Sequence, residues 1–108
     1  MIFTACIPAY ADTMLYKGEI GNPITTGTWS MDAAGEWHYA TTEALKNTWA
    51  YIANPWNDNK PAWFIFDENG KMLTGWQLVY WNGSYQYYYF HEVSDGKKGE
   101  CQLGGNYT

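Results

Sequence analysis

The sequence predicts an all-β fold in which tandem β-hairpins stack as a short solenoid. Residues 63–76, W-F-I-F-D-E-N-G-K-M-L-T-G-W, show the underlying pattern: an aromatic and β-branched run, a turn, a short return and a Gly-Trp step. Such runs favour strands, and the Asn69-Gly70 step allows the positive φ angles of a tight hairpin turn, so we expect residues 63–66 and 71–74 to pair. Aromatic residues form 19% of the 108 residues. One small core does not bury so many rings, so they either stack along an elongated structure or stay exposed as binding platforms.

The same pattern recurs less cleanly in three units, over residues 27–39, 47–66 and 74–90. The units open at tryptophans that are 20 and 27 residues apart, namely Trp29, Trp49 and Trp76. A period in this range is typical of a solenoid of supersecondary units. Glycine-containing steps suited to hairpin turns separate the aromatic runs: Ala34-Gly35, Asn69-Gly70, Asn82-Gly83 and Asp95-Gly96.

Two segments fit the repeat poorly. Residues 54–61, N-P-W-N-D-N-K-P, are expected to form a longer polar loop between two strands. Residues 41–49 contain good helix formers and a threonine that could cap a helix, so local propensity alone predicts a helix. The repeat instead makes residues 37–40 one strand and residues 45–52 its return, with 41–44 as the turn, and we favour this interpretation.

The N-terminal residues differ in character from the repeats. Residues 1–11 are small and apolar and end in Ala-Tyr-Ala, which predicts the tail of a secretory signal peptide. An ordinary N-terminal strand is the alternative. Residues 12–26 are expected to be a lead-in or linker, and residues 27–108 the repeat module.

Charge and cysteine spacing exclude several functions. A net charge of −5 argues against nucleic acid as a partner, and no run approaches the roughly 20 apolar residues of a membrane span. Cys6 and Cys101 lie near opposite ends without metal-ligand spacing, so we expect no metal, although a long-range disulfide between them is compatible with the sequence.

The sequence also carries few signs of catalysis. Asp67 and Glu68 are adjacent, so in a strand or turn their carboxylates point apart and do not pair as acid and base. His38 and His91 lack a nucleophile at a suggestive position. We therefore expect no enzyme and no cofactor.

The three units resemble the cell-wall-binding repeats, also called choline-binding repeats, of Gram-positive surface proteins. That pattern runs Gly-Trp, strand, Asn-Gly or Asp-Gly turn, Trp-Tyr-Tyr and an aliphatic residue, a second turn, Met and the next Gly-Trp. Residues 63–76 match it throughout, 87–96 match its first half, and 29–39 match it more loosely. At Gly105-Asn106 the sequence departs from the pattern, where Gly-Trp would come.

The resemblance implies hairpins stacked in a left-handed solenoid, with aromatic ligand cages between successive hairpins. By position, the best cage comprises Trp49, Trp63 and Tyr88 or Tyr89, with Met72 as a floor. A second candidate cage comprises Trp29, Trp37 and either Phe64 or Phe66. Trp76 and Tyr87 would form a half-site.

The expected function is therefore a non-catalytic module that anchors a secreted bacterial protein to the cell surface. Its ligand would be choline-bearing teichoic acid or a wall glycan, since flat rings bind trimethylammonium groups by cation–π attraction and also stack on sugars. Each site would be weak, and several sites on one polymer would hold by avidity. A structural spacer with buried rings is the alternative, a small hydrolase is a more distant one, and dimerisation through the open end of the solenoid is plausible.

Overall fold

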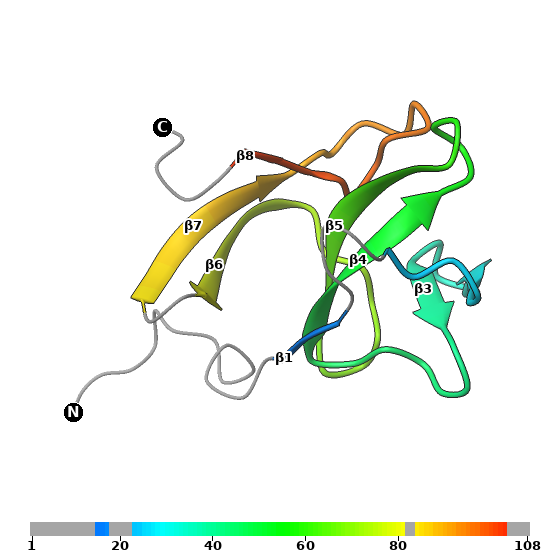
Figure 1. Cartoon of the computed structure of the whole chain (residues 1–108), viewed down its shortest axis with the longest axis horizontal. Helices are drawn as coiled ribbons and strands as arrows, with labels where there is room; N and C mark the ends of the chain where they lie inside the picture. Colours follow the sequence, from blue (N-terminus) through cyan, green and yellow to red (C-terminus); the bar gives the residue numbers. More distant parts are fainter. Residues whose placement is uncertain (1–14, 18–22, 82–83, 104–108) are drawn as a thin grey trace.

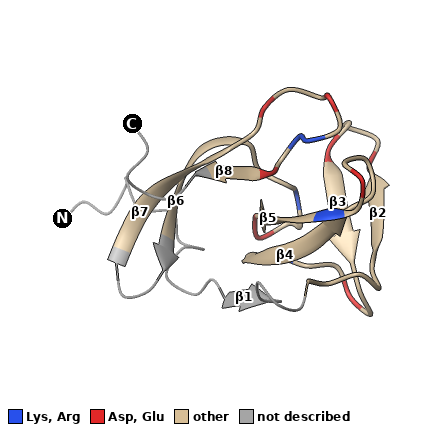
Figure 2. Cartoon of the chain, turned by 45° about the horizontal axis from the view of Figure 1, so that its top comes forward, with Lys and Arg blue, Asp and Glu red and all other residues tan. Residues whose placement is uncertain are grey.

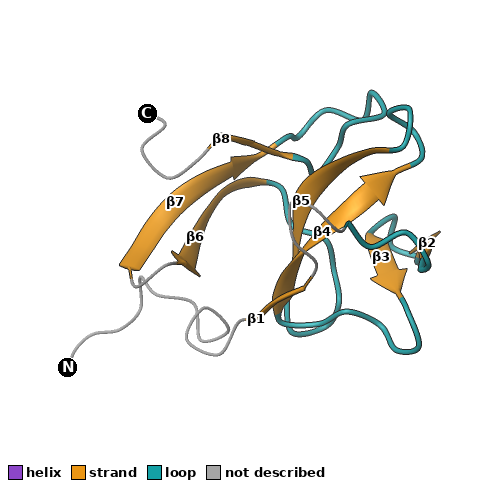
Figure 3. Cartoon of the chain, in the orientation of Figure 1, coloured by secondary structure: helices purple, strands orange, loops and turns teal. Residues whose placement is uncertain are grey.

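The computed structural model describes residues 15–17, 23–81 and 84–103, and these residues form strands and loops without a helix (Figures 1 and 3). The all-β prediction is therefore confirmed for the described part of the chain. The expected signal-peptide tail at residues 1–11, the Asn82-Gly83 turn and the Gly105-Asn106 end all lie outside the described residues. So does Cys6, which leaves its pairing with Cys101 untested. The strands are β1 Leu15–Lys17, β2 Thr28–Met31, β3 Trp37–Ala40, β4 Thr48–Asn54, β5 Lys60–Phe66, β6 Gly75–Trp81, β7 Ser84–Phe90 and β8 Cys101–Leu103.

Three antiparallel strand pairs form the framework: β2 with β3, β4 with β5, and β6 with β7. Each pair joins two runs that the sequence analysis placed in one unit, at residues 27–39, 47–66 and 74–90. The pairs belong to separate sheets, to which β1 adds in parallel beside β4 and β8 adds antiparallel beside β7. In both views the pairs follow one another in chain order along the molecule (Figures 1 and 2).

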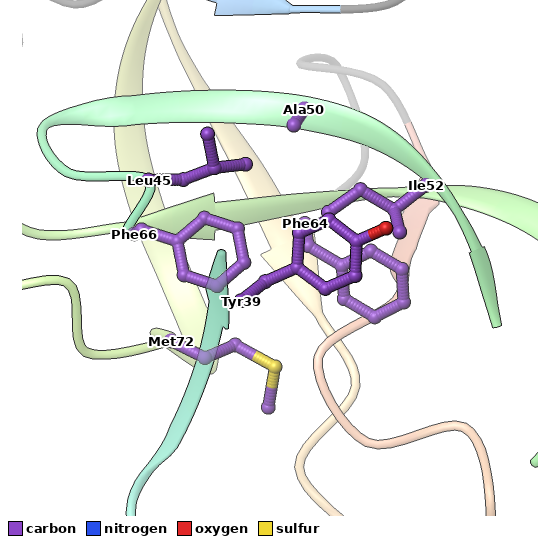
Figure 4. Close-up of a cluster of buried hydrophobic side chains, with 7 residues drawn as sticks. All are labelled: Tyr39, Leu45, Ala50, Ile52, Phe64, Phe66 and Met72. Atoms are coloured by element: carbon purple, nitrogen blue, oxygen red, sulfur yellow. The ribbon is translucent and has the colours of Figure 1, made fainter. Parts of the chain in front are cut away.

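The middle pair, β4 and β5, is covered on both faces. On β5, Phe64 and Phe66 belong to a buried cluster shared with Tyr39 of β3, drawn in Figure 4. Ile65 points the other way, into a second cluster with Val79 and Phe90 of the β6–β7 pair. A strand buried on both faces needs a continuous apolar run, which explains the sequence of residues 63–66. Each such side chain contributes about 1.5–3 kcal/mol through burial, so the two clusters hold the three pairs together.

The connection from β3 to β4 corrects one prediction. Residues 41–49 form no helix, which agrees with the interpretation favoured from the repeat. Residues 45–52, however, are not the return of β3: the strand begins at Thr48 and pairs with β5. The backbone N–H of Leu45 donates to Tyr39 O at 2.9 Å, and the Leu45 side chain is buried in the first cluster. Asn47 then adopts φ 52°, a left-handed conformation that redirects the chain before β4 begins.

The expected pairing of residues 63–66 with 71–74 is formed only in part. Met72 forms an antiparallel β-bridge with Phe66, closed by hydrogen bonds from Asp67 N to Lys71 O and from Leu73 N to Ile65 O, both at 2.9 Å. The regular ladder of β5 is made with β4 on its other edge. Of the Asn69-Gly70 step, only Gly70 has a positive φ, at 83°. The turn is held instead by Asp67, whose Oδ1 accepts the N–H groups of Asn69 at 2.8 Å and Lys71 at 2.9 Å.

The turn between β2 and β3 has the same construction. Asp32 Oδ1 accepts the N–H groups of Ala34 at 2.9 Å and Glu36 at 3.0 Å, and Gly35 has φ 85°. Both turns therefore follow the rule Asp-x-x-Gly-x, in which a side-chain acceptor replaces a tight two-residue turn.

Residues 12–26, expected as a lead-in or linker, join the central sheet in their described part. Strand β1 pairs in parallel with Thr48–Ala50, and Ile24 forms a parallel bridge with Ile52. Ile24 N donates to Tyr51 O at 2.8 Å, and Ala53 N donates to Ile24 O at 3.0 Å. This segment therefore covers the open edge of β4.

Candidate ligand-binding site

The first predicted cage comes together as a packed cluster. The rings of Trp49 and Trp63 have centroids 4.7 Å apart, and those of Trp49 and Tyr88 lie 5.7 Å apart at 68°. Trp49 is only 3% exposed, because these rings fill the space between the middle pair and the β6–β7 pair. Burial raises the pKa of the Tyr88 hydroxyl, with Cys101 as a smaller cause. The cluster leaves almost no surface of Trp49 for a ligand.

Other residues assigned to that cage lie elsewhere. Met72 belongs to the first buried cluster, beside Phe64 and Phe66, and is not the floor of the Trp49 group. Tyr89 contacts Trp76 across β6 and β7, with centroids 5.1 Å apart.

The predicted half-site lies on the outer face of the β6–β7 pair. Trp76 is 44% exposed and Tyr87 is 52% exposed. Tyr87 lies opposite Leu78 in the register, near the Trp76–Tyr89 contact along the same two strands. Dimerisation through the open end of the solenoid stays a prediction.

The second predicted cage opens into a pocket. A cavity of about 270 Å³ is lined by Trp29, Trp37 and Phe64, three of the residues named from the sequence, and by Trp56 and Met72. Phe66 is fully buried behind it, so Phe64 is the phenylalanine that reaches the pocket. Its remaining lining residues are Asn54, Ser94, Gly96 and Lys98.

Three indole rings meet at this pocket. The centroids of Trp37 and Trp56 lie 4.9 Å apart, those of Trp29 and Trp56 lie 6.2 Å apart, and those of Trp29 and Trp37 lie 6.3 Å apart. The rings are inclined to one another by 57°, 70° and 88°, respectively, so they present faces and edges in different directions. Inclined aromatic walls of this kind suit a ligand with apolar faces and a polar rim.

The β2–β3 pair places two of these rings. Trp29 lies opposite Tyr39 and Trp37 lies opposite Met31, so both tryptophans are on the same face of the pair. Trp29 is further held by edge contacts with Tyr39 at 4.8 Å and with Phe64 at 5.0 Å. The Tyr39 hydroxyl accepts the N–H of Gly27 at 2.8 Å, which fixes the start of β2.

Trp56 comes from the loop after β4, and Asn54 holds that loop. Asn54 is 3% exposed; its Oδ1 accepts the N–H of Trp56 at 3.0 Å, and its Nδ2 donates to Gly96 O at 2.9 Å and Glu100 Oε2 at 2.8 Å. Asn57 Nδ2 donates to the same carboxylate oxygen at 3.1 Å. One buried amide therefore ties the Trp56 loop to residues 94–100 on the other side of the pocket.

The loop between β7 and β8 completes the pocket wall. Gly99 N donates to His91 O at 2.8 Å, and His91 N donates to Glu100 O at 2.9 Å, which closes the loop at its base. Gly99 has φ 90°, and a Cβ there would lie 2.4 Å from Met72 Sδ. The glycine thus lets the loop backbone rest directly on Met72, under the aromatic rings.

Two histidine–aspartate pairs stabilise turns near the pocket. His91 Nε2 lies 3.1 Å from both carboxylate oxygens of Asp95, and this hydrogen bond holds the pKa of Asp95 below its ordinary value of 3.8. His38 Nε2 lies 2.7 Å from Asp32 Oδ2, and the pKa of Asp32 is lowered first by the N–H of Glu36 and then by His38. Neither pair lines the pocket, so their role is in loop structure.

The indole nitrogen of Trp29 is an unsatisfied donor. It is enclosed by the protein and has no hydrogen-bond partner among the described residues. An enclosed donor without a partner costs about 1–3 kcal/mol.

The side chains that commonly bind metals are dispersed over the structure. Within the described ranges, no three His, Cys, Asp or Glu side chains are grouped to hold a metal ion. The described part of the chain also contains no helix long and apolar enough to cross a membrane.

Sequence reasoning missed Trp56, which it placed in a polar loop. One feature of the sequence could have identified it: Trp56 is a single large aromatic residue among asparagines and prolines, outside the predicted strands. Such a residue is a candidate contact for a ligand. The ring is 54% exposed, the most exposed tryptophan among those whose side chains the structure describes.

Comparisons of the chain with protein-family models, with curated proteins and with solved structures found no match.

Proposed function

We propose that the chain is a non-catalytic binding module that holds a sugar residue of a cell-surface glycan between Trp29, Trp37 and Trp56. The observation that carries the proposal is the meeting of three inclined indole rings around a cavity of about 270 Å³. Pockets for drug-sized ligands span about 300–1,000 Å³, so this cavity suits a single ring.

The lining favours a sugar over a quaternary amine. Lys98 lines the pocket and no carboxylate does, so a trimethylammonium group would meet repulsion from the lysine with no opposing acidic side chain. A sugar carries no positive charge and supplies C–H faces for the rings. Choline-type ligands are the second candidate, because three rings at such distances also suit cation–π contacts.

Attachment to a polymer follows from the affinity that one such site provides. An apolar contact of this size leaves an affinity near the millimolar range after the costs of association. Useful retention then requires several sites along one polymer. The proposal therefore includes the finer architecture, a short solenoid of stacked hairpins in a secreted surface protein. The support for it is the chain-order succession of three hairpins and the two matching Asp-x-x-Gly-x turns.

The alternative function, a structural spacer with buried rings, is supported by the group of Trp49, Trp63 and Tyr88. Trp49 is almost fully buried against Trp63 and Tyr88, as expected if these rings join hairpins. We assign that group to structure and the Trp56 pocket to binding.

The test is isothermal titration calorimetry with chitohexaose, soluble wall glycan and free choline. Binding of a glycan that is lost in Trp56→Ala and retained in Trp76→Ala supports the proposal. Trp76 is the matched control, because it is also about half exposed and lies on the β6–β7 pair, outside the pocket. Binding of choline alone would move the assignment to a cation cage, and binding of none of them would leave the spacer.

A further inference from the structure

A second cavity lies beside the aromatic pocket. Its volume is about 420 Å³, and Trp37, Met72 and Lys98 line both cavities. The two spaces are therefore neighbours that share these three side chains. A ligand seated in the aromatic pocket could extend past Trp37 into the second cavity.

The second cavity differs from the first in its charges. Lys71 and Lys98, from segments far apart in the sequence, both line it, together with Glu36. The chain has 6 basic and 11 acidic residues, so two of the few cations face one cavity of an acidic protein. Figure 2 shows how sparse the basic residues are along the chain.

The two lysines are weakly engaged by the protein itself. Lys71 Nζ lies 3.7 Å from Glu36 Oε2, and both side chains are well exposed, at 45% and 38%, so this contact contributes little. The described residues place no carboxylate within ion-pair distance of Lys98. An incoming anion can therefore displace Glu36 from Lys71 and also reach Lys98.

The backbone around both lysines is held in place. Lys71 N donates to Asp67 Oδ1 at 2.9 Å at the end of the Asp-x-x-Gly turn. Lys98 immediately precedes Gly99, whose backbone rests on Met72. The two cations thus sit on anchored segments, which reduces the ordering cost of binding.

We propose that the second cavity is a subsite for the anionic substituent of the bound glycan, a carboxylate or a phosphate held by Lys71 and Lys98. The module would then select acidic over neutral glycans. This inference rests on the proposed glycan-binding function, because the aromatic pocket supplies the sugar contact and the lysines supply the preference for charge.

The experiment compares two ligands of equal length at low salt. One is chitohexaose, which is neutral; the other is a peptide-free strand of alternating N-acetylglucosamine and N-acetylmuramic acid, which carries a free carboxylate on every second sugar. A glucosylated glycerol-phosphate polymer tests phosphate as the anion. The variants are Lys71→Met, Lys98→Met and Glu36→Gln, with Lys97→Met as the control, because Lys97 is exposed, adjacent to Lys98 and lines neither cavity.

We expect one of the acidic ligands to bind about threefold to fivefold more tightly than chitohexaose in about 20 mM salt, the scale of exposed charge contacts. The preference should fall in about 300 mM salt because the charges are screened. Lys71→Met should remove the preference while leaving chitohexaose affinity unchanged, because Lys71 lines only the second cavity. Lys98→Met should also remove the preference, and Lys71→Arg should retain it. Glu36→Gln should increase it.

Each other outcome has a distinct meaning. Equal affinity for all three ligands, or a loss in Lys97→Met as large as in Lys98→Met, would overturn the anionic subsite and leave the glycan pocket standing. Binding of neither neutral nor acidic glycan would remove the proposed function itself, and this inference with it. Lysine-dependent binding of only the phosphate polymer would support the subsite and identify its anion.

Discussion

Gly99 is the residue at which the pocket wall meets the protein core most closely, and its replacement gives a quantitative test. In Gly99→Ala the new Cβ would lie 2.4 Å from Met72 Sδ, 2.7 Å from Met72 Cε and 3.1 Å from Phe64 Cδ2. The backbone also has φ 90°, which disfavours any residue with a Cβ. The variant therefore combines backbone strain with overpacking under the aromatic rings.

Gly35→Ala separates these two effects. Gly35 has a similar φ of 85°, and a Cβ at this position would meet nothing within 4 Å, so this substitution carries only the backbone penalty of about 1–2 kcal/mol. Overpacking adds about 1–3 kcal/mol at Gly99. We expect Gly99→Ala to reduce the free energy of unfolding by about 2–5 kcal/mol in total.

Urea unfolding followed by tryptophan fluorescence measures the difference between the two variants. Both should show the wild-type dependence on urea concentration, with the midpoint of Gly99→Ala well below that of Gly35→Ala. Adding Met72→Ala should lower the cost of Gly99→Ala, since the obstructing side chain is removed. Equal midpoints for Gly35→Ala and Gly99→Ala would refute the contact between this loop and Met72.

Three further outcomes follow from the same contacts. Asn54→Ala should destabilise the protein by about 1–3 kcal/mol, because Trp56 N, Gly96 O and the Glu100 carboxylate lose a buried partner; an unchanged thermal midpoint would contradict this. Trp49→Ala should lower the free energy of unfolding, measured in urea, by about 3–5 kcal/mol. Trp76→Ala should lower it much less, because Trp76 is half exposed, and similar losses would contradict the assignment of Trp49 to the core. The folded-state pKa of Asp95 is lowered, so the stability that this carboxylate contributes is present above its unfolded pKa near 3.8 and is lost as pH falls through its folded pKa. The free energy of unfolding of Asp95→Asn, measured from about pH 6 to pH 2, should therefore decline less steeply than that of the wild type. An identical decline would argue against the His91–Asp95 contact.

Much of the fold was predictable because it depends on local pattern. The apolar run at residues 63–66 and the repeated Gly and Trp positions identify three hairpins, and β2–β3, β4–β5 and β6–β7 are the pairs observed. Which segment forms the regular ladder with β5 was not encoded locally. β4 pairs with β5 over seven residues, whereas residues 71–74 form a single bridge to it, between Met72 and Phe66.

The candidate site was only half predictable for the same reason. Trp29, Trp37 and Phe64 follow from the repeat spacing, which places them on facing hairpins. Trp56 reaches the pocket because Asn54 bonds to Gly96 and Glu100, 42 and 46 residues away, and no periodicity encodes such contacts. The Trp49 group was predicted to be a cage because of its positions in the sequence. In the folded protein its rings pack against one another and leave almost no surface of Trp49 for a ligand, and the sequence pattern does not distinguish these two outcomes.

The claim that Trp29, Trp37 and Trp56 form the binding site is tested most directly by NMR. The chain has seven tryptophans, and each indole N–H gives its own signal. During titration with the glycan that binds best, the signals of these three should move together and saturate with one dissociation constant. Movement confined to Trp49 and Trp63, or to Trp76, with these three unchanged, would contradict the account and place the ligand elsewhere.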